Sequence, residues 1–406
     1  MLDWKTLGPK ALSEVPAEAP LIGHLLRSSD ELSVFVSRSS TTNEPVLLIV
    51  NDAHRATRTR AALEALARTL AELGSELRFR ALVATGTHRF AERERREFED
   101  ATFGGCGLDI ADTAWHDADD RKALTELAGV RLHHWLGSSR FLLPIGSCEP
   151  HYFAGVTGAH KTITIGCFSR AAIERNHAGA MNPASDVLQL DGNPVFEESV
   201  DVLANLKAAG KEVFAINEVV CDHTLLAAAA GDPLTALREL LSTVRRVFLQ
   251  QIPAPVDVLH LKVPEPLGRN LYQADKALKN NHRAVRDGGG IVLEAKCPEG
   301  IGPDAFMGLL ERAGDYASAI RLVETEGYRL GDHKAVKLRY LTDRACRGVH
   351  VALVSPGISQ TQAQAAGMAL FAEVAPAVDW LRRVTGGSFQ QGLVIEDAGV
   401  CCVAPR

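Results

Sequence analysis

This sequence lacks the features that would direct a protein to a membrane, to secretion or to nucleic acid. No apolar run approaches the ~20 residues that a membrane-spanning helix needs. Residues 1–5 do not form a charged start before an apolar stretch, so they do not resemble a secretory signal. The 44 basic and 50 acidic side chains give a net charge of −6, whereas a nucleic-acid-binding protein needs a basic face. We therefore expect a cytoplasmic protein that binds neither membranes nor nucleic acid.

Motifs for the common metal and nucleotide sites are also absent. The eight cysteines include no C-x-x-C pair, which argues against a zinc ribbon or an iron–sulfur cluster. In a cytoplasmic chain we expect most of them to be reduced and buried, and the adjacent pair Cys401-Cys402 suggests no mechanism. The glycines at 155 and 158 match neither G-x-G-x-x-G nor G-x-x-x-x-G-K-[ST], so neither common nucleotide-binding fold is indicated.

What the sequence does contain predicts an α/β protein. Its 406 residues are 46 % hydrophobic and 23 % charged, which is enough for each of two domains to bury a core. Short apolar runs alternate with helical patterns, and this favours open, largely parallel sheets. The predicted strands are 46–50, 78–84, 141–146, 256–263, 290–295 and 348–354. The predicted helices are 58–73, 91–100, most of 200–250, 270–286 and 304–324.

The domain boundary is predicted at Pro253 and Pro255, because two prolines stop a helix and favour extended chain. We expect residues 1–254 to form a cofactor-binding catalytic domain and residues 255–389 to form a substrate-closing domain. Residues from about 390 to 406 are expected to pack back onto the first domain. The active site is then expected in the cleft between the two domains.

Polar side chains follow the first two predicted strands. In open α/β sheets ligands bind at the carboxyl ends of strands, where Asp52 and Arg55 follow one strand and His88 follows the next. Most of the fourteen histidines are expected to be surface or satisfied core residues. His88 differs in its context, Gly86-Thr87-His88-Arg89, and an imidazole with a pKa near ~6.5 suits general acid–base catalysis.

The densest group of reactive side chains is the run Pro150-His151-Tyr152-Phe153-Ala154-Gly155-Val156-Thr157-Gly158-Ala159-His160-Lys161, followed by Asn176-His177. His151 is a candidate base. Gly155 and Gly158 form either a tight turn or a backbone that a phosphate can approach. Lys161 is either a solvated charge or a partly buried amine that can act as a nucleophile. His177 has no partner at metal-site spacing, so it indicates a metal only where a cofactor supplies the other ligands.

The second half offers fewer candidates. Gln273 and Lys276 are three residues apart and share a helix face, which is either solvated or presented to a carboxylate. Gly289 and Gly290, within Asp287-Gly288-Gly289-Gly290, form either a helix cap and turn or a contact with a cofactor.

Taken together, these motifs resemble the nickel-dependent lactate racemase family over nearly the whole chain. Five motifs in the right order, with matching gaps, carry the resemblance, although each alone is weak. They are Asn51-Asp52-x-x-Arg55, Gly86-Thr87-His88-Arg89, Pro150-His151-x-x-Ala154-Gly155-x-x-Gly158-x-x-Lys161, Asn176-His177 and Gln273-x-x-Lys276.

The resemblance implies a nickel-pincer nucleotide cofactor, a pyridinium-derived mononucleotide that binds nickel through two sulfur arms and a ring carbon. It implies that Lys161 is joined covalently to this cofactor and that His177 is the one protein ligand of the nickel. The other residues expected to contact or support the cofactor are Asp52, Gly155, Gly158, Gly289 and Gly290.

The same resemblance implies the reaction, which is racemisation or epimerisation of a 2-hydroxy acid. His88 and His151 match the two acid–base histidines, Arg55 and Lys276 match the residues that hold the substrate carboxylate, and Gln273 supports them. The α-hydrogen leaves as hydride to the cofactor, giving a 2-keto acid, and returns to the opposite face. Cofactor-biosynthesis proteins are implied as partners, whereas the oligomeric state is not indicated.

The sequence departs from the family pattern near the cofactor and in the substrate pocket. Ala159 and Ile165 stand where the family has glycine and proline. No tryptophan occurs about sixty residues after Lys276, where the lactate enzymes have one, and His333 or Lys334 there could meet a second polar group. The substrate is therefore lactate or another 2-hydroxy acid. The alternatives are a nicotinamide-linked 2-hydroxyacid dehydrogenase and a protein that binds or delivers the cofactor without turnover.

Overall fold

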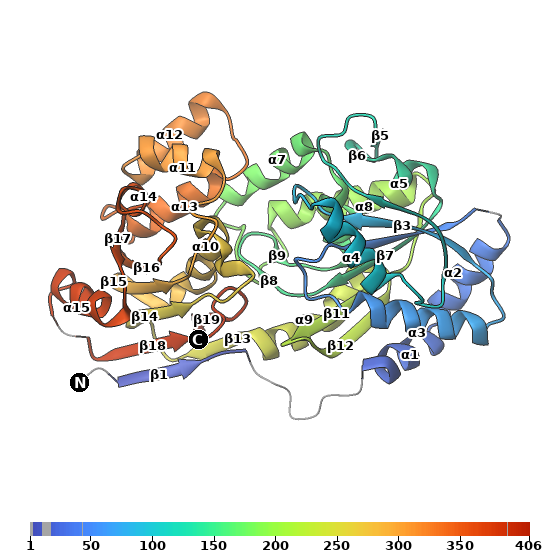
Figure 1. Cartoon of the computed structure of the whole chain (residues 1–406), viewed down its shortest axis with the longest axis horizontal. Coiled ribbons are helices and arrows are strands. Elements are labelled where there is room, and N and C mark those ends of the chain that lie inside the picture. Colours follow the sequence, from blue (N-terminus) through green and yellow to red (C-terminus); the bar gives the residue numbers. More distant parts are fainter. Residues whose placement is uncertain (1–2, 10–17, 43, 388) are drawn as a thin grey trace.

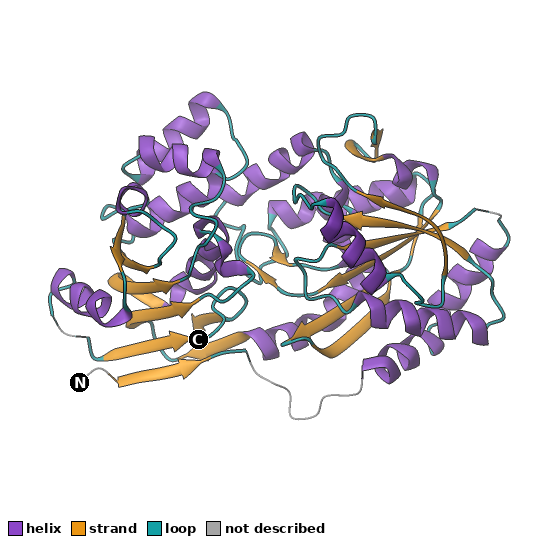
Figure 2. Ribbon diagram, in the orientation of Figure 1, coloured by secondary structure: helices purple, strands orange, loops and turns teal. Residues whose placement is uncertain are grey.

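The computed structural model describes residues 3–9, 18–42, 44–387 and 389–406. These residues form two lobes, and each lobe is built around an open sheet that helices cover (Figure 1, Figure 2). The short strands β8 (Pro150–His151) and β9 (Gly155–Val156) lie between the lobes (Figure 1). This arrangement confirms the predicted α/β class with largely parallel sheets.

The first sheet is parallel except at one edge. Its order is β12-β11-β7-β2-β3-β4, with β10 beside β7, and only the β11–β12 pair is antiparallel among these described strands. The bounds are β2 (Val46–Asn51), β3 (Arg78–Ala84), β4 (Asp109–Trp115), β7 (Phe141–Ser147), β10 (Glu212–Val213), β11 (Ala215–Cys221) and β12 (Thr224–Gly231).

The second sheet is parallel throughout, in the order β1-β18-β14-β15-β16-β17. The bounds are β1 (Asp3–Leu7), β14 (Val256–Lys262), β15 (Val285–Glu294), β16 (His350–Val354), β17 (Met368–Phe371) and β18 (Gln391–Ile395). Two further pairs are β5 (Leu124–Leu127) with β6 (Val130–His133), and β13 (Leu249–Ile252) with β19 (Cys402–Pro405).

The helices of the first lobe are α1 (Glu18–Arg27), α2 (Asp30–Ser40), α3 (Thr59–Glu72), α4 (Glu92–Thr102), α5 (His134–Ser138), α6 (Ala159–Ile163), α7 (Arg170–Ala178), α8 (Pro194–Ala208) and α9 (Pro233–Phe248). Those of the second are α10 (Leu271–Asn281), α11 (Asp304–Arg312), α12 (Tyr316–Glu326), α13 (Asp332–Thr342), α14 (Gln360–Ala365) and α15 (Val374–Val384). No helix among the described residues is both long and apolar enough to span a bilayer. None of the eight cysteines forms a disulfide and six are buried, in agreement with the prediction.

The central strands are apolar at every position because both faces of each sheet are covered. In β2, Val46, Leu48 and Val50 pack into a core with α1, α2 and α3. Leu47 and Ile49 point the other way, into a core that includes α7 and α8. Since successive strand residues alternate between the two faces, the polar residues that follow the strand are the first ones free to enter a cavity.

The two ends of the chain join the second lobe. β1 pairs with β18 inside the second sheet, and β19 pairs with β13 at the predicted boundary (Figure 1). Residues 3–7, expected in the first domain, lie in the second sheet. The segment from about 390 onward was expected to pack back onto residues 1–254, and its last strand, β19, does pair with β13 at the end of that range. The domain limits at 254/255 and near 390 themselves stay predictions.

Three predicted helices differ from the structure. Residues 215–231, predicted as helical, form the β11–β12 hairpin, where strand pairing overrides the helix propensity of Ala227–Ala230. The helix predicted over 270–286 ends at Asn281, because Val285 already belongs to β15. The helix predicted over 304–324 is divided between α11 and α12, since Asp315 caps a new helix by accepting from the backbone of Ser318.

Candidate functional site

Two adjoining cavities lie at the carboxyl ends of strands, as predicted for an open α/β sheet. The first cavity is lined by side chains that follow β2 and β3 and by α6 and α7, among them Asp52, Arg55, His88, Gly158, Lys161 and His177. The second cavity, of about 390 Å³, lies between the lobes and is lined by residues from both, among them Arg55, His88, His151, Gln273 and Lys276. Arg55, His88 and Thr157 line both cavities, so the two form one site. The volume suits a small-molecule ligand.

His88 is oriented by a buried carboxylate. Its Nδ1–H donates to Asp52 Oδ2 over 2.8 Å, and the backbone N–H of His54 donates to Asp52 Oδ1. Although burial raises the pKa of Asp52, the hydrogen bond and charge of His88 lower it below the usual value, so the carboxylate stays ionised. With Nδ1 bonded to Asp52, the lone pair of the neutral ring is on Nε2.

His151 has the opposite tautomer. The backbone N–H of Ala154 donates to its Nδ1 over 3.2 Å, so the proton of the neutral ring is on Nε2, which lies 3.2 Å from Lys161 Nζ. Burial, with the charges of Lys161 and Lys276, keeps the pKa of His151 well below its usual range. The structure thus supplies one imidazole held at Nδ1 by a carboxylate, and one that accepts from the backbone at Nδ1 and contacts Lys161 at Nε2.

The amine of Lys161 is held by the start of α6. The backbone N–H of Ala159 donates to Asn217 Oδ1 over 2.7 Å, and the neighbouring Thr162 hydroxyl donates to Asn51 Oδ1 over 2.7 Å at the end of β2. Burial and the charge of Arg55 lower the pKa of Lys161 to about 7. A large part of these amines is therefore uncharged, and nucleophilic, at neutral pH.

The glycines of the loop before Lys161 are required by contacts within the protein. Gly155 has φ +75°, and a Cβ there would lie 2.2 Å from the carbonyl oxygen of Gln189. A Cβ at Gly158 would lie 2.9 Å from Asn217 Oδ1. The tight-turn interpretation therefore accounts for both glycines, although Gly158 also lines the first cavity.

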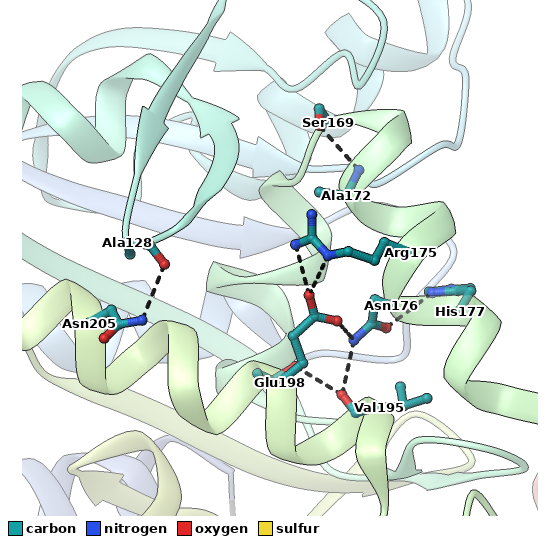
Figure 3. Close-up of polar contacts among 10 residues, drawn as sticks. Ala128, Ser169, Ala172, Arg175, Asn176, His177, Val195, Glu198 and Asn205 are labelled. Atoms are coloured by element: carbon teal, nitrogen blue, oxygen red, sulfur yellow. Dashed lines mark hydrogen bonds and ion pairs between the residues drawn. The ribbon is translucent and has the colours of Figure 1, made fainter. Parts of the chain in front are cut away.

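His177 is held by Asn176 (Figure 3), and its ring also bonds to the backbone of Ile173. Its Nδ1 donates to Asn176 Oδ1 over 3.2 Å. The Asn176 amide must face this way, because its Nδ2 donates to the carbonyl of Val195 over 3.1 Å and to Glu198 Oε2 over 2.8 Å. Arg175 in turn donates to Glu198 Oε1 over 2.8 Å. The lone pair of His177 is then on Nε2, as a metal ligand requires.

The charge state of His177 supports the same role. Burial, with Lys161 nearby, lowers the pKa of the ring to about 3, so it is neutral at physiological pH. A neutral imidazole with its other nitrogen bonded to a protein acceptor is the usual form of a histidine metal ligand.

Cations surround the site. Lys276, on α10, faces Arg55 across the second cavity, and Gln273 lies one turn earlier on the same helix. Burial and the charges of Arg55 and Lys334 lower the pKa of Lys276 well below its usual value. Because buried like charges repel each other, this grouping is stable only with an anion or with a neutral amine. The arrangement suits a carboxylate.

Three residues that the sequence analysis considered for the site, Gly289, Gly290 and His333, do not line either cavity. Gly289 and Gly290 belong to β15, where a Cβ would meet Asp257 and Leu381, and neither lines the two cavities. The structure therefore gives no support to their role at the cofactor. His333 is held between two tyrosines, Tyr152 and Tyr328, whose hydroxyls lie 2.9 and 2.7 Å from its two nitrogens. Both ring nitrogens of His333 are therefore hydrogen-bonded within the protein, and His333 connects the two lobes in the interior.

Sequence reasoning missed the brace of His177 and part of the cavity wall. Asn176 stood in a quoted motif without a role, but nothing in the sequence connects it to Glu198. His54 also went unassigned, although it lines the second cavity and bonds to Arg269 over 3.0 Å. Burial lowers the pKa of His54 to about 4. In the sequence, only the position of His54 two residues after Asp52 indicated that it lies near the site.

The fold and the site together define an α/β enzyme-like protein whose interlobe cleft brings His88 and His151 beside Arg55 and Lys276. The lactate racemase N-terminal domain model matches residues 3–187, and the lactate racemase C-terminal domain model matches residues 255–402. The chain therefore belongs to the lactate racemase family, and the prediction of a racemase-type isomerase is confirmed at that level.

Named relatives agree with this assignment. The chain is 25 % identical over 295 residues to lactate racemase from Thermoanaerobacterium thermosaccharolyticum, covering 70 % of this chain and 67 % of that protein. It is 25 % identical over 272 residues to lactate racemase from Lactiplantibacillus plantarum, covering 64 % of this chain and 62 % of that protein.

Solved structures share the fold. The lactate racemase apoprotein from T. thermosaccharolyticum superposes with a TM-score of 0.82 at 22 % identity, covering 99 % of this chain and 95 % of that one. A protein from Thermotoga maritima superposes with a TM-score of 0.72 at 16 % identity, covering 98 % of this chain and all of that one.

The brace gives a direct prediction. Asn176→Ala removes the side-chain acceptor for Nδ1–H and leaves the backbone of Ile173 as the remaining partner of the ring, so the Nδ1–H tautomer of His177 should lose population. Nitrogen-15 NMR of the histidine rings should show one Nδ1–H tautomer for His177 in the wild type and a mixture in the variant. Asn205→Ala is the matched control, because Asn205 lies on the neighbouring helix α8 and contacts Ala128 instead (Figure 3). An unchanged His177 tautomer in Asn176→Ala would contradict the role given to the brace.

Proposed function

We propose that this protein is a racemase or epimerase of 2-hydroxy acids that uses a nickel-pincer nucleotide. The observation that carries the proposal is the braced, neutral His177 in the same cavity as the Lys161 amine, with two histidines and two cations beside them. Lactate or another 2-hydroxy acid is the substrate. The partners are expected to include the proteins that make the cofactor, and the location is expected to be the cytoplasm.

The donor set fits this cofactor. Among the described residues, two imidazoles line the first cavity, His88 and His177, and no thiolate does. Since Asp52 holds His88 for proton transfer, His177 is the imidazole proposed to bind a metal whose other ligands come from the cofactor. Lys161 presents an amine that can form a covalent bond to a carboxyl-derived group. When bound, the cofactor would supply the hydride acceptor. Asp52, Gly158 and the turn Thr85–Thr87 line the same cavity and would contact it.

The two histidines are proposed to move the hydroxyl proton. For one enantiomer, His88, held by Asp52, would accept the hydroxyl proton, and His151 in its protonated form would return a proton to the oxygen of the inverted product. For the other enantiomer the two histidines would exchange these roles. Inversion of a centre requires two such groups, and proton transfer of this kind contributes about 10²–10⁴-fold to a rate.

Arg55 and Lys276 are proposed to hold the substrate carboxylate, and Gln273 to support them. Arg55 offers a planar pair of donors that matches a carboxylate, while Lys276 adds a second positive charge across the cavity. An anion between them also restores the charged form of Lys276, whose pKa is otherwise lowered by its cationic neighbours.

Protein made in a host that synthesises the cofactor should carry one nickel per chain and a cofactor mass on Lys161. It should invert single-enantiomer 2-hydroxy acids, followed by chiral chromatography. His88→Asn and His151→Asn should each lower kcat by about 10²-fold or more while nickel and adduct remain. His134→Asn is the control, since His134 bonds to Ala123 away from both cavities. Protein without nickel and adduct, or full activity in both variants, would refute the proposal.

The lowered pKa of Lys161 makes a prediction that needs no cofactor. An acylating reagent reacts with the neutral amine, whose fraction rises as the pH rises through about 7. In apoprotein, mass spectrometry should therefore show half-maximal labelling rate of Lys161 near pH 7, far below the ~10.4 of an ordinary lysine. Lys5, an exposed lysine, serves as the comparison. If Lys161 and Lys5 show the same pH profile, the amine is not activated by its surroundings.

A further inference from the structure

His54 contacts both members of the Asp52–His88 pair. Its backbone N–H donates to Asp52 Oδ1 over 3.0 Å, while Asp52 Oδ2 accepts from the ring of His88. The ring of His54 meets the His88 ring edge-on, with 4.9 Å between centroids, and lies against Phe90 with 4.7 Å between centroids. A shift of His54 would therefore move both the carboxylate and the surface against which the His88 ring packs.

The ring of His54 is in turn held by the second lobe. Nη1 of Arg269 lies 3.0 Å from His54 Nε2. Because a guanidinium can only donate, Nε2 is the acceptor and the proton of the neutral ring is on Nδ1. Arg269 ends a short 3₁₀ helix that directly precedes α10, the helix that carries Gln273 and Lys276. One hydrogen bond thus joins the acid–base side of the cavity to the helix proposed to hold the substrate.

Arg269 reaches the first lobe with the one guanidinium nitrogen that does not bond to Glu299. Its Nε donates to both carboxylate oxygens of Glu299 over 3.1 Å, and Nη2 donates to Oε1 over 3.0 Å. Asn270 also donates to Glu299 Oε2 over 3.0 Å, so the carboxylate itself is held. The planar fork of arginine makes this arrangement possible, because a lysine could not hold Glu299 through two nitrogens and reach His54 with a third.

The charge state of His54 allows it to accept this bond. Burial lowers the pKa of His54 to about 4, against the attraction of Asp52, and the charges of His88, Arg269 and Arg55 lower it further. The ring is therefore neutral near pH 7 and can accept a hydrogen bond from a cation. A partly exposed ion pair such as Arg269–Glu299 contributes only about 0–1 kcal/mol to stability, so unfolding is not the main effect expected from removing Arg269.

We propose that Arg269 is a positioning residue for the reaction: through His54 it fixes the Asp52–His88 pair relative to α10. Arg269 takes no part in proton transfer and does not hold the substrate carboxylate. Because Arg269 and His54 belong to different lobes, their bond forms only when the lobes adjoin across the cavity. This role rests on the proposed function, since it takes His88 to be an acid–base group.

The first test is a double-mutant cycle on the nickel-loaded protein, with whichever of lactate, 2-hydroxybutanoate and glycerate the wild type inverts fastest. Arg269→Met removes the donor, and His54→Phe removes the acceptor but keeps a ring beside His88. Arg269→Met should lower kcat about tenfold, since small misplacements of a reacting group are costly, and should change KM by less than about twofold. In the His54→Phe background it should lower kcat by less than about twofold, because coupled residues are not additive.

Arg312→Met is the matched control. Arg312 pairs with Glu326 on the surface of the same lobe and lines neither cavity. This variant should leave both kcat and KM unchanged. Nickel content and the mass of the Lys161 adduct should be the same in all the variants, so that a lower kcat does not reflect lost cofactor.

A second test needs neither cofactor nor substrate. In the apoprotein, nitrogen-15 NMR should show His54 as the Nδ1–H tautomer, with a pKa of about 4. Arg269→Met removes both the donor to Nε2 and a positive charge, so the pKa of His54 should rise and its tautomers should become mixed. Asp52, His88 and Arg55, the other groups whose charges act on His54, stay unchanged. This measurement also tests the proposal if His54→Phe does not fold.

Three results would overturn the role of Arg269 and leave the racemase proposal intact. One is a higher KM with kcat unchanged in Arg269→Met, because Arg269 would then bind the substrate directly. The second is an equal effect of Arg269→Met with and without His54. The third is an unchanged pKa and tautomer of His54 in the apoprotein. If the nickel-loaded wild type inverts none of the three acids, the proposed function fails and the catalytic role of Arg269 fails with it, whereas NMR still decides whether Arg269 holds His54.

Discussion

The crowding of positive charge around one cleft is the constraint on which this site depends. Arg55, Lys161 and Lys276 converge on adjoining cavities, and the pKa of each lysine is lowered by burial and by its cationic neighbours. A protein gains nothing in stability from such a group, because desolvation and repulsion both oppose it. Such a group is typical of a binding site, in which a bound anion balances the positive charge. The lowered pKa of Lys161 also leaves part of its amine uncharged and able to react.

The same cations explain the state of the histidines. Positive charge and burial keep His151 and His177 neutral, and hydrogen bonds decide which nitrogen of each ring is free. His88 differs, since Asp52 supports it from behind. We therefore propose that His88 and His151 exchange the hydroxyl proton with the substrate and that His177 binds a metal. Three residues of the same type acquire separate tasks from their neighbours, with no difference in their own chemistry.

Much of this could be predicted from the sequence, and the failures have physical causes. Strands such as 46–50 and 78–84 were found because both faces are buried, and the polar residues that follow them mark the sheet end where ligands bind. The hairpin β11–β12 was missed because alanine favours helices unless strand pairing overrides it. The brace through Glu198 and the cavity that Arg55 and Lys276 line together join residues far apart in the chain, and without the fold no spacing reveals them.

We propose that His88 and His151 handle the hydroxyl proton and leave the carbon-bound hydrogen out of exchange with water. The direct measurement is inversion of one enantiomer by the nickel-loaded protein in D₂O, with deuterium at C2 followed by NMR. The account predicts an inverted product that keeps its original hydrogen. Deuterium that enters C2 in step with inversion would contradict it, because His88 or His151 would then remove the α-proton.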